Sequence, residues 1–386
     1  MINKHRRIFL LSILAFFPLT LITLSLLFAS PEKTRRPMTV DDALNMTRVG
    51  NTLISPDGQW VFFSKSELNW AKNRRDTKYY LIPADGGEEF QYIGREGGDS
   101  FQYSPDGQYL SFKRSVDKKN QLFLMRTSGG EAIQATKHKT SIGFYRWSPQ
   151  SDKIFFIADR PRSPEEEKKY KAGEDVIFVD EGPNGQQEGR WKQIWVFDLK
   201  SRKETLLLDK ELIINELDVS PDGQQILFTA RETNRRNDGY KNEIYLFNVS
   251  TKKITRLTHN RAPESSPLWA PNGQVFAYLA ADDKEWLNRN SKIWLMEPKT
   301  RRYELLSANF EGSIRDLFWS PDSQYIYFNG QQGINTNLFR LHIKSKKIEK
   351  LTDVQGTLRV TGFSRDRSRY VYIFSDCDTP PDVYTS

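Results

Sequence analysis

Short apolar strands alternate with polar turns along most of the chain. An apolar run at residues 144–147 (Phe-Tyr-Arg-Trp) precedes one turn and another at 154–157 (Ile-Phe-Phe-Ile) follows it, and residues 317–319 and 325–328 repeat the arrangement. Runs of β-branched and aromatic residues between turn residues are typical of β-hairpins. A second pair of strands follows each hairpin, so the predicted repeating unit is a sheet of four antiparallel strands.

The turns of the first hairpins share a phrase. Ser-Pro-Asp-Gly occurs at residues 55–58, 104–107 and 220–223, Ser-Pro-Asp-Ser at 320–323, and degenerate copies at 148–150, 270–273 and 364–366. Proline presets the first corner of a turn, aspartate bonds to nearby amides, and glycine accepts a positive φ. The copies start 49, 44, 72, 50, 50 and 44 residues apart, and such a period is typical of propeller blades. The predicted fold of residues 51–386 is an all-β, seven-bladed β-propeller, with the large aromatic residues before the turns packed between blades.

Two units deviate from the repeat. The longest interval holds a charged insert at about residues 160–190, which is too polar for a core and is predicted to project as a loop or short helix. The seventh unit supplies strands at residues 360–363 and 370–373 and a third at 382–384. No fourth strand follows, so the last blade is expected to be incomplete, less stable than the others and open to pairing at its edge.

A basic head, Lys4-His5-Arg6-Arg7, precedes an apolar run from Ile8 to Ala29. A run of about 20 apolar residues behind a positive head directs export and is long enough to span a bilayer. Cleavage after Ala29 or Ser30 would place a large residue where a small one is preferred, which favours an uncleaved anchor but leaves a signal peptide open. Arg6-Arg7 also fits a twin-arginine leader, although an ordinary basic head is preferred. The predicted domains are a signal peptide or signal anchor at residues 1–30, a linker with a short helix at 31–50, and the propeller, exported to the periplasm or held outside the cytoplasm by the membrane anchor.

Composition narrows the function classes. The formal net charge is +8, but residues 1–36 carry +5 of it, and the mildly basic remainder gives no support to nucleic-acid binding. A single cysteine, Cys377, excludes a disulfide framework and a thiolate zinc cluster. The histidines of the body, His138, His259 and His342, stand alone in the sequence and are expected at the surface or in turns. Neither Asp282-Asp283 nor Asp376-Cys377-Asp378 has the spacing of a calcium loop.

The insert contains Glu165-Glu166-Glu167, a pattern that invites comparison with the paired glutamates that hold a substrate amino terminus in dipeptidyl peptidases. A solvated charge run is the preferred interpretation, since Lys168 and Lys169 follow directly. The sequence therefore predicts no catalytic, cofactor-binding or metal-binding residue, and no cofactor.

The repeats resemble the N-terminal propeller of the prolyl oligopeptidase family of serine peptidases, especially its acylaminoacyl-peptidase and dipeptidyl-peptidase branches. Residues 38–44 (MTVDDAL) resemble the short helix before the first blade in that family, residues 173–176 (GEDV) lie where its members carry a similar insert, and residues 379–384 (TPPDVY) resemble its closing segment. TolB-like periplasmic propellers share the turn phrase. The resemblance covers about residues 38–386 and implies a propeller that covers an active site and limits access to short peptides.

The sequence departs from that family in its chemistry. No G-x-S-x-G occurs in it, so the nucleophile elbow of the family's α/β-hydrolase domain has no counterpart and no peptidase activity is expected of this chain alone. The leading hypothesis is a non-catalytic propeller that gates peptide access for a hydrolase domain, supplied in trans or lost by truncation. The alternative is a TolB-like periplasmic scaffold whose partner is an envelope protein. A propeller lactonase or sugar dehydrogenase is disfavoured by the scarcity of histidines.

Overall fold

The computed structural model describes residues 36–386 except 95–96, 174–189, 234–235, 260–261 and 283–285. The chain divides into two compact units, residues 1–46 and 47–386. The predicted leader at residues 1–30 lies outside the described residues, and among the helices within the described ranges none is long and apolar enough to cross a membrane.

The described part of the first unit contains one helix, α2 (Val40–Asn45). Thr39 caps its amino terminus, because the Thr39 hydroxyl accepts a hydrogen bond from the Asp42 N–H (3.2 Å) while the Asp42 carboxylate accepts one from the Thr39 N–H (2.8 Å). Arg36 pairs with Asp42 at 2.5 Å, and the hydrogen bond from Arg36 is the main cause that holds the pKa of that carboxyl far below its usual range.

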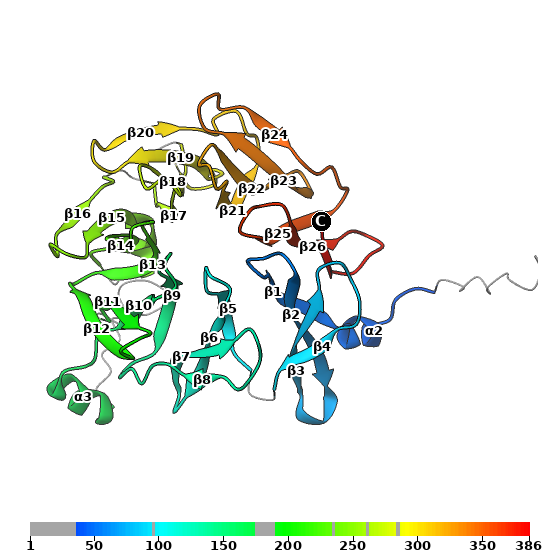
Figure 1. Cartoon of the computed structure of the whole chain (residues 1–386), viewed down its shortest axis with the longest axis horizontal. Helices are drawn as coiled ribbons and strands as arrows, with labels where there is room; N and C mark the ends of the chain where they lie inside the picture. The colour runs from blue at the N-terminus through cyan, green and yellow to red at the C-terminus, as the bar shows by residue number, and fades with distance from the viewer. Residues whose placement is uncertain (1–35, 95–96, 174–189, 234–235, 260–261, 283–285) are drawn as a thin grey trace, which may run out of the picture. The chain divides into compact units, whose positions relative to one another are not determined.

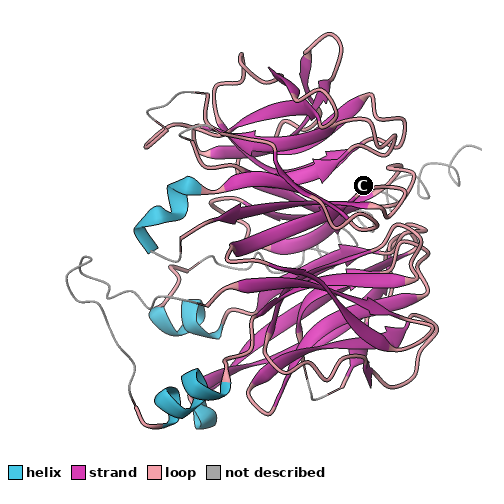
Figure 2. Ribbon diagram, turned by 90° about the vertical axis from the view of Figure 1, so that its left-hand side faces the viewer, coloured by secondary structure: helices cyan, strands magenta, loops and turns pink. Residues whose placement is uncertain are grey.

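The second unit is built almost entirely of antiparallel strands (Figure 1 and Figure 2). The first sheet contains β1 (Arg48–Ile54), β2 (Trp60–Asn69), β3 (Arg74–Pro83) and β4 (Phe90–Ile93), with the 3-10 turn η1 (Trp70–Lys72) between β2 and β3. The second contains β5 (Asp99–Tyr103), β6 (Tyr109–Val116), β7 (Lys119–Arg126) and β8 (Ile133–Gln134). The third contains β9 (Ile142–Trp147), β10 (Lys153–Asp159), β11 (Lys192–Asp198) and β12 (Lys203–Asp209). In each of these sheets the strands pair in chain order.

Two further four-stranded sheets follow the same order. The fourth contains β13 (Ile213–Val219), β14 (Gln225–Arg231), β15 (Glu243–Asn248) and β16 (Ile254–Arg256), with the 3-10 helix η3 (Arg236–Lys241) before β15. The fifth contains β17 (Ser265–Trp269), β18 (Phe276–Ala280), β19 (Lys292–Glu297) and β20 (Arg302–Leu305).

The sixth sheet has seven strands and consists of two parts. The first part contains β21 (Ser313–Trp319), β22 (Tyr325–Gln332), β23 (Asn335–His342) and β24 (Ile348–Lys350), and the second contains β25 (Thr357–Phe363), β26 (Tyr370–Ser375) and β27 (Asp382–Thr385). A single parallel pair, Thr336 with Thr357, joins β23 to β25. The repeated four-stranded pattern confirms the prediction of an all-β propeller.

The turn phrase has the same geometry in copy after copy. In the first, the Ser55 hydroxyl donates to Asp57 (2.5 Å) and accepts from the Trp60 N–H (2.9 Å). The same bonds recur at Ser104, Ser220 and Ser320. The fourth position always has a positive φ, from 60° at Ser323 to 78° at Gly107. This geometry accounts for the residue types of the turn phrase, since each of them makes or permits a specific hydrogen bond of the turn.

Large side chains fill the spaces between neighbouring sheets, as the sequence predicted. Trp147 lies at the end of β9, is 7% exposed, stacks on Tyr109 of the second sheet and donates its indole N–H to Ser111 at 2.8 Å. Trp319 does the same in the sixth sheet, where its indole N–H donates to the Leu268 carbonyl at 3.1 Å. Burial of such side chains is the main favourable term that holds neighbouring sheets together.

The last strands pack against the first sheet. Val371 of β26 is fully buried in a cluster with Ile54, Val61 and Phe63 of the first sheet. The Arg365 N–H donates to the Pro56 carbonyl at 2.8 Å. Within the described ranges the first sheet takes its strands from one continuous stretch, so side-chain packing and turn contacts join it to β25–β27 without a shared sheet.

The charged insert contains a short helix, α3 (Pro164–Lys171). A short helix is one of the two forms predicted for it, the other being a loop. Ser163 caps it, and Glu166 accepts from the Ser163 N–H at 2.6 Å. The rest of the insert, residues 174–189, lies outside the described residues.

Candidate functional site

The first strands of the six sheets, together with the first strand of the second part of the sixth sheet, lie nearest the centre of the second unit (Figure 1): β1, β5, β9, β13, β17, β21 and β25. We call them the inner strands. Each ends at a turn phrase, and the residue two positions before the turn is half-buried in all of them; in β9, β13, β17 and β21 the residue four positions before the turn is half-buried too, and buried residues lie between. This alternation follows from the period of a strand, because side chains that point away from the core on these strands share one face.

Two carboxylates stand on this face of β13. The Asp218 carboxylate accepts a hydrogen bond from the Trp269 N–H of β17 at 2.8 Å, and Glu216 accepts one from the Ser266 N–H at 2.6 Å. These bonds tie the fourth sheet to the fifth. Both groups are partly withdrawn from water, and burial raises the pKa of Asp218 to about 6 and also raises that of Glu216.

Arg146 of β9 is the cation that faces this pair. Its positive charge partly opposes the effect of burial on the pKa of both carboxyls. The Arg146 guanidinium lies over the Phe144 ring at 5.0 Å, and its buried Nε has no hydrogen-bond partner among the described residues. Charged side chains of β9 and β13 therefore form one group, to which β17 donates backbone hydrogen bonds, and the group has a net negative charge when both carboxyls are ionised.

A second charged contact joins the two parts of the sixth sheet. Arg359 of β25 binds Asp316 of β21 with two bonds, at 2.9 and 3.1 Å. Buried Asn329 lies behind them, where its amide donates to Asp316 (3.0 Å) and to the Val360 carbonyl (2.8 Å), and its oxygen accepts from the Val360 N–H (2.9 Å). Two-bond geometry fixes the guanidinium plane, so this cluster is a structural joint that also places charge on the inner face.

The sequence pattern does not distinguish these inner-strand charges from other polar positions. Arg146, Asp218 and Asp316 each sit inside an apolar run, so they read as ordinary polar residues of an alternating strand. A usable signal was present, because Arg146 and Asp218 occupy the same position, two residues before their turns. Aligning the seven copies on the turn phrase brings such positions into register.

Glu165, Glu166 and Glu167 lie in α3, and their partners belong to that helix or to the two residues before it, Arg162 and Ser163. Glu166 completes the cap, Glu165 lies 3.5 Å from Lys169, and Glu167 lies 3.7 Å from Lys171. These are the i,i+4 pairs of a solvated helix. The geometry agrees with the preferred interpretation of a solvated charge run.

His138 contradicts the expectation of a surface or turn histidine. Its side chain is buried, with Nδ1 2.7 Å from the Glu204 carboxylate of β12 and its ring packed edge-on against Phe156 and Trp195. The reason is tertiary, because Glu204 lies 66 residues further along the chain in the third sheet. This contact links the end of the second sheet to the third.

The described residues contain no group of three or more His, Cys, Asp or Glu side chains placed to hold a metal ion. Asp376 accepts bonds from the Asp378 and Thr379 N–H groups at 2.9 and 2.7 Å, which is the geometry of a capped turn.

Comparison with known proteins shows which propellers this chain is similar to. Residues 220–284 match the model of the dipeptidyl peptidase IV N-terminal region. An uncharacterized peptidase of Bacillus subtilis, YuxL, is 24% identical over 202 residues, which are 49% of this chain and 30% of that protein. The acylaminoacyl peptidase of Pyrococcus horikoshii superposes with a TM-score of 0.65 at 14% identity, over 89% of this chain and 51% of that one. The resemblance to a prolyl oligopeptidase propeller is confirmed.

A third similar structure is a propeller alone. The β-propeller domain of the Trilobed protease from Pyrococcus furiosus, described as having an open velcro topology, superposes with a TM-score of 0.63 at 12% identity. That superposition covers 89% of this chain and 93% of that domain. By contrast, this chain spans about a third of YuxL and about half of the acylaminoacyl peptidase. The similarity to the longer proteins is therefore a similarity to their propellers.

Proposed function

We propose that this chain is the propeller portion of a prolyl-oligopeptidase-type peptidase and controls which peptides reach a hydrolase domain. The observation that carries the proposal is the superposition on the propeller of an acylaminoacyl peptidase, over nearly all of this chain and half of that enzyme. The peptidase relative and the match to a dipeptidyl peptidase propeller support the same class. We count seven blades, taking the two parts of the sixth sheet as the sixth and seventh, with three strands in the seventh.

The inner strands supply the means of selection. Glu216 and Asp218 accept hydrogen bonds from backbone N–H groups of the neighbouring sheet. Asp316 is held by the Arg359 side chain, so these charges do not move freely with a passing peptide. Fixed dipoles and charges discriminate between ligands because they cannot reorganise to suit a wrong one. In this proposal the space between the inner strands is too narrow for a folded protein. A short peptide in an extended conformation can pass along these strands.

We propose that the chain itself does not hydrolyse peptides, since its sequence has no nucleophile elbow. The hydrolase acts as a separate fold, which meets the propeller either within a longer polypeptide or as a bound partner. We also propose that the basic head and apolar run at residues 4–29 take the propeller out of the cytoplasm.

The proposal is tested by adding the purified chain to the isolated hydrolase domain of a similar acylaminoacyl peptidase. Cleavage of chromogenic peptide amides of two residues and of fifteen residues is measured with and without the chain, and the mixture is run on a size-exclusion column. We expect co-elution and a selective fall in cleavage of the longer peptide. A heat-denatured sample of the chain is the control.

Equal inhibition of both peptides, or separate elution at high concentrations of both proteins, would contradict the gating role. Turnover of either peptide by the chain alone would contradict the assignment as a non-catalytic part, provided that the activity disappears on mutation of one of its own serines.

A further inference from the structure

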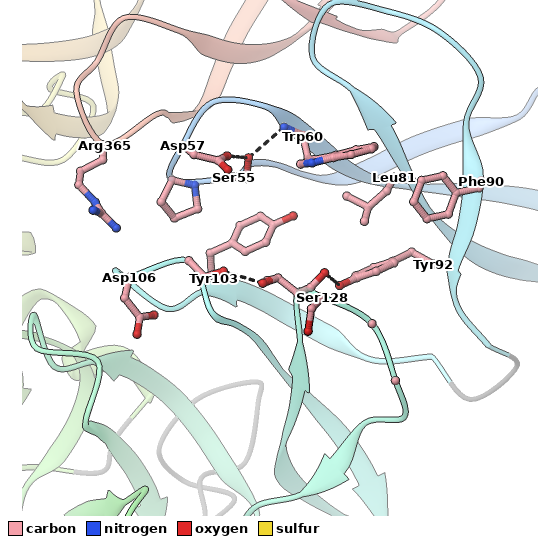
Figure 3. A pocket seen from close by; sticks show the side chains of 15 residues that line it. Ser55, Asp57, Trp60, Leu81, Phe90, Tyr92, Tyr103, Asp106, Ser128 and Arg365 are labelled. Carbon is pink, nitrogen blue, oxygen red and sulfur yellow. Dashed lines mark hydrogen bonds between the residues drawn. The ribbon is translucent and has the colours of Figure 1, made fainter.

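A cleft of about 660 Å³ opens between the first and second sheets, on the face that carries their turn phrases (Figure 3). Trp60, Leu81, Phe90 and Tyr92 of the first sheet line one side, and Tyr103 and the turn at residues 127–130 line the other. Such a volume is in the usual range for sites that enclose a small ligand.

Tyr103 lines the cleft at a position that holds a larger side chain in three other sheets. The last residue before the turn phrase is a buried tryptophan in three sheets, Trp147, Trp269 and Trp319. The second sheet has Tyr103 in that position, with a single ring. Its hydroxyl points into the cleft in Figure 3 and has no hydrogen-bond partner among the described residues. Burial raises the pKa of this phenol above its ordinary range, so it is a neutral donor at any physiological pH.

One end of the cleft is aromatic and accessible. Trp60 is 36% exposed and Phe90 is 47% exposed, and their rings meet edge to face with centroids 6.0 Å apart. Phe90 also meets Tyr92 edge to face at 6.3 Å, and the Tyr92 hydroxyl donates to the Thr127 carbonyl at 3.0 Å. That bond fixes the aromatic wall across the two sheets, which prepares a surface for an apolar or aromatic group before any ligand arrives.

The other end carries charge of both signs. Asp57 and Asp106 each use one carboxylate oxygen in their own turn, where it accepts from the serine hydroxyl at 2.5 Å, and the second oxygen has no partner among the described residues. Arg365 donates to the Pro105 carbonyl and has no carboxylate partner within the described ranges. Figure 3 shows Arg365 and Asp106 at the end of the cleft away from Phe90, with Asp57 between Arg365 and Trp60.

We infer that this cleft binds a short zwitterionic peptide, of about two residues, with an aromatic or large aliphatic side chain. The side chain fits against Trp60 and Phe90, the free amine meets Asp57 and Asp106, and the free carboxylate meets Arg365. A ligand with only one charge would pair with either the carboxylates or the guanidinium and leave the other without a partner from the ligand. The inference concerns binding and does not depend on the proposed gating function.

Binding is measured by isothermal titration calorimetry of the chain with the dipeptide Gly-Phe, and with its N-acetylated, C-amidated form as the uncharged comparison. We expect Gly-Phe to bind and the blocked form to bind at least about tenfold more weakly, the effect of losing one or two charged hydrogen bonds. Phe90→Ala and Asp106→Asn should each weaken Gly-Phe about tenfold on the same grounds.

Matched variants separate the site from the fold. Asp222→Asn changes the equivalent turn of the fourth sheet, and Tyr303→Ala removes an exposed aromatic from the fourth strand of the fifth sheet; neither should alter binding. Tyr103→Trp introduces the wedge that other sheets already accommodate and should abolish binding while the protein stays folded. Absence of heat with Gly-Phe at millimolar concentration, equal affinity for the blocked dipeptide, or undiminished binding by folded Tyr103→Trp would each overturn the inference.

Discussion

Replacement of Asp218 by asparagine is expected to stabilise the protein, and to do so only above acidic pH. Burial raises the pKa of this carboxyl from 3.8 to about 6. The folded state therefore holds a proton that the unfolded state releases, and the free energy of unfolding falls as pH rises from about 4 to about 6. A shift of about two units corresponds to about 3 kcal/mol, which is the most that Asp218→Asn can recover.

The asparagine amide keeps the hydrogen bond that does not depend on the negative charge. An asparagine oxygen still accepts the bond that the Trp269 N–H donates at 2.8 Å, so the variant removes ionisation and keeps the contact between the fourth and fifth sheets. The lost attraction to Arg146 is already included in the shifted pKa, because that charge opposes the rise.

Urea unfolding followed by tryptophan fluorescence, at half-unit steps from pH 4 to pH 8, measures the difference between variant and wild type. We expect no difference near pH 4 and a gain that grows through pH 6 and levels off above it. Asp222→Asn is the control of opposite sign, since bonds from Ser220 and Gln224 lower the pKa of Asp222. Its carboxylate stabilises the fold at neutral pH, and that contribution is lost as pH falls. A gain for Asp218→Asn that is the same at pH 4 and pH 8 would refute the argument from desolvation.

Other variants test the contacts that hold the sixth sheet together and the role of residues 1–30. Asn329→Leu should cost about 2–4 kcal/mol, because it leaves the buried N–H and carbonyl of Val360 unpaired; urea unfolding measures the loss, and hydrogen exchange over β25 should speed up more than over β14. Gly330→Ala should cost about 1–3 kcal/mol, since its Cβ would lie 2.6 Å from the nearest aromatic ring atom, whereas Gly239→Ala, with no atom within 4 Å, should leave the melting temperature unchanged. A chain expressed with residues 1–30 should fractionate outside the cytoplasm, and one expressed without them should stay inside; equal distribution of the two would contradict export.

The repeating unit could be predicted from the sequence because its turns depend on local chemistry. Each turn phrase closes its own hydrogen bonds within five residues, as Ser55 does with Asp57 and Trp60. Alternation of apolar and polar residues then places the strands on either side, because a strand's side chains alternate between faces. Fold class, repeat period and the position of the insert follow from such short-range rules and needed no tertiary information.

The charged clusters and the cleft depend on contacts between different sheets. Glu204 reaches His138 over 66 residues and draws it into the interior, although nothing near His138 in the sequence signals burial. Burial by the surrounding strands raises the pKa of Asp218, and the charge of Arg146, 72 positions earlier, partly opposes that rise. The cleft beside Tyr103 is lined by residues of the first and second sheets together with Arg365, which are far apart in the sequence. A residue's water exposure and charged neighbours are properties of the assembled sheets, so only the tertiary structure determines them.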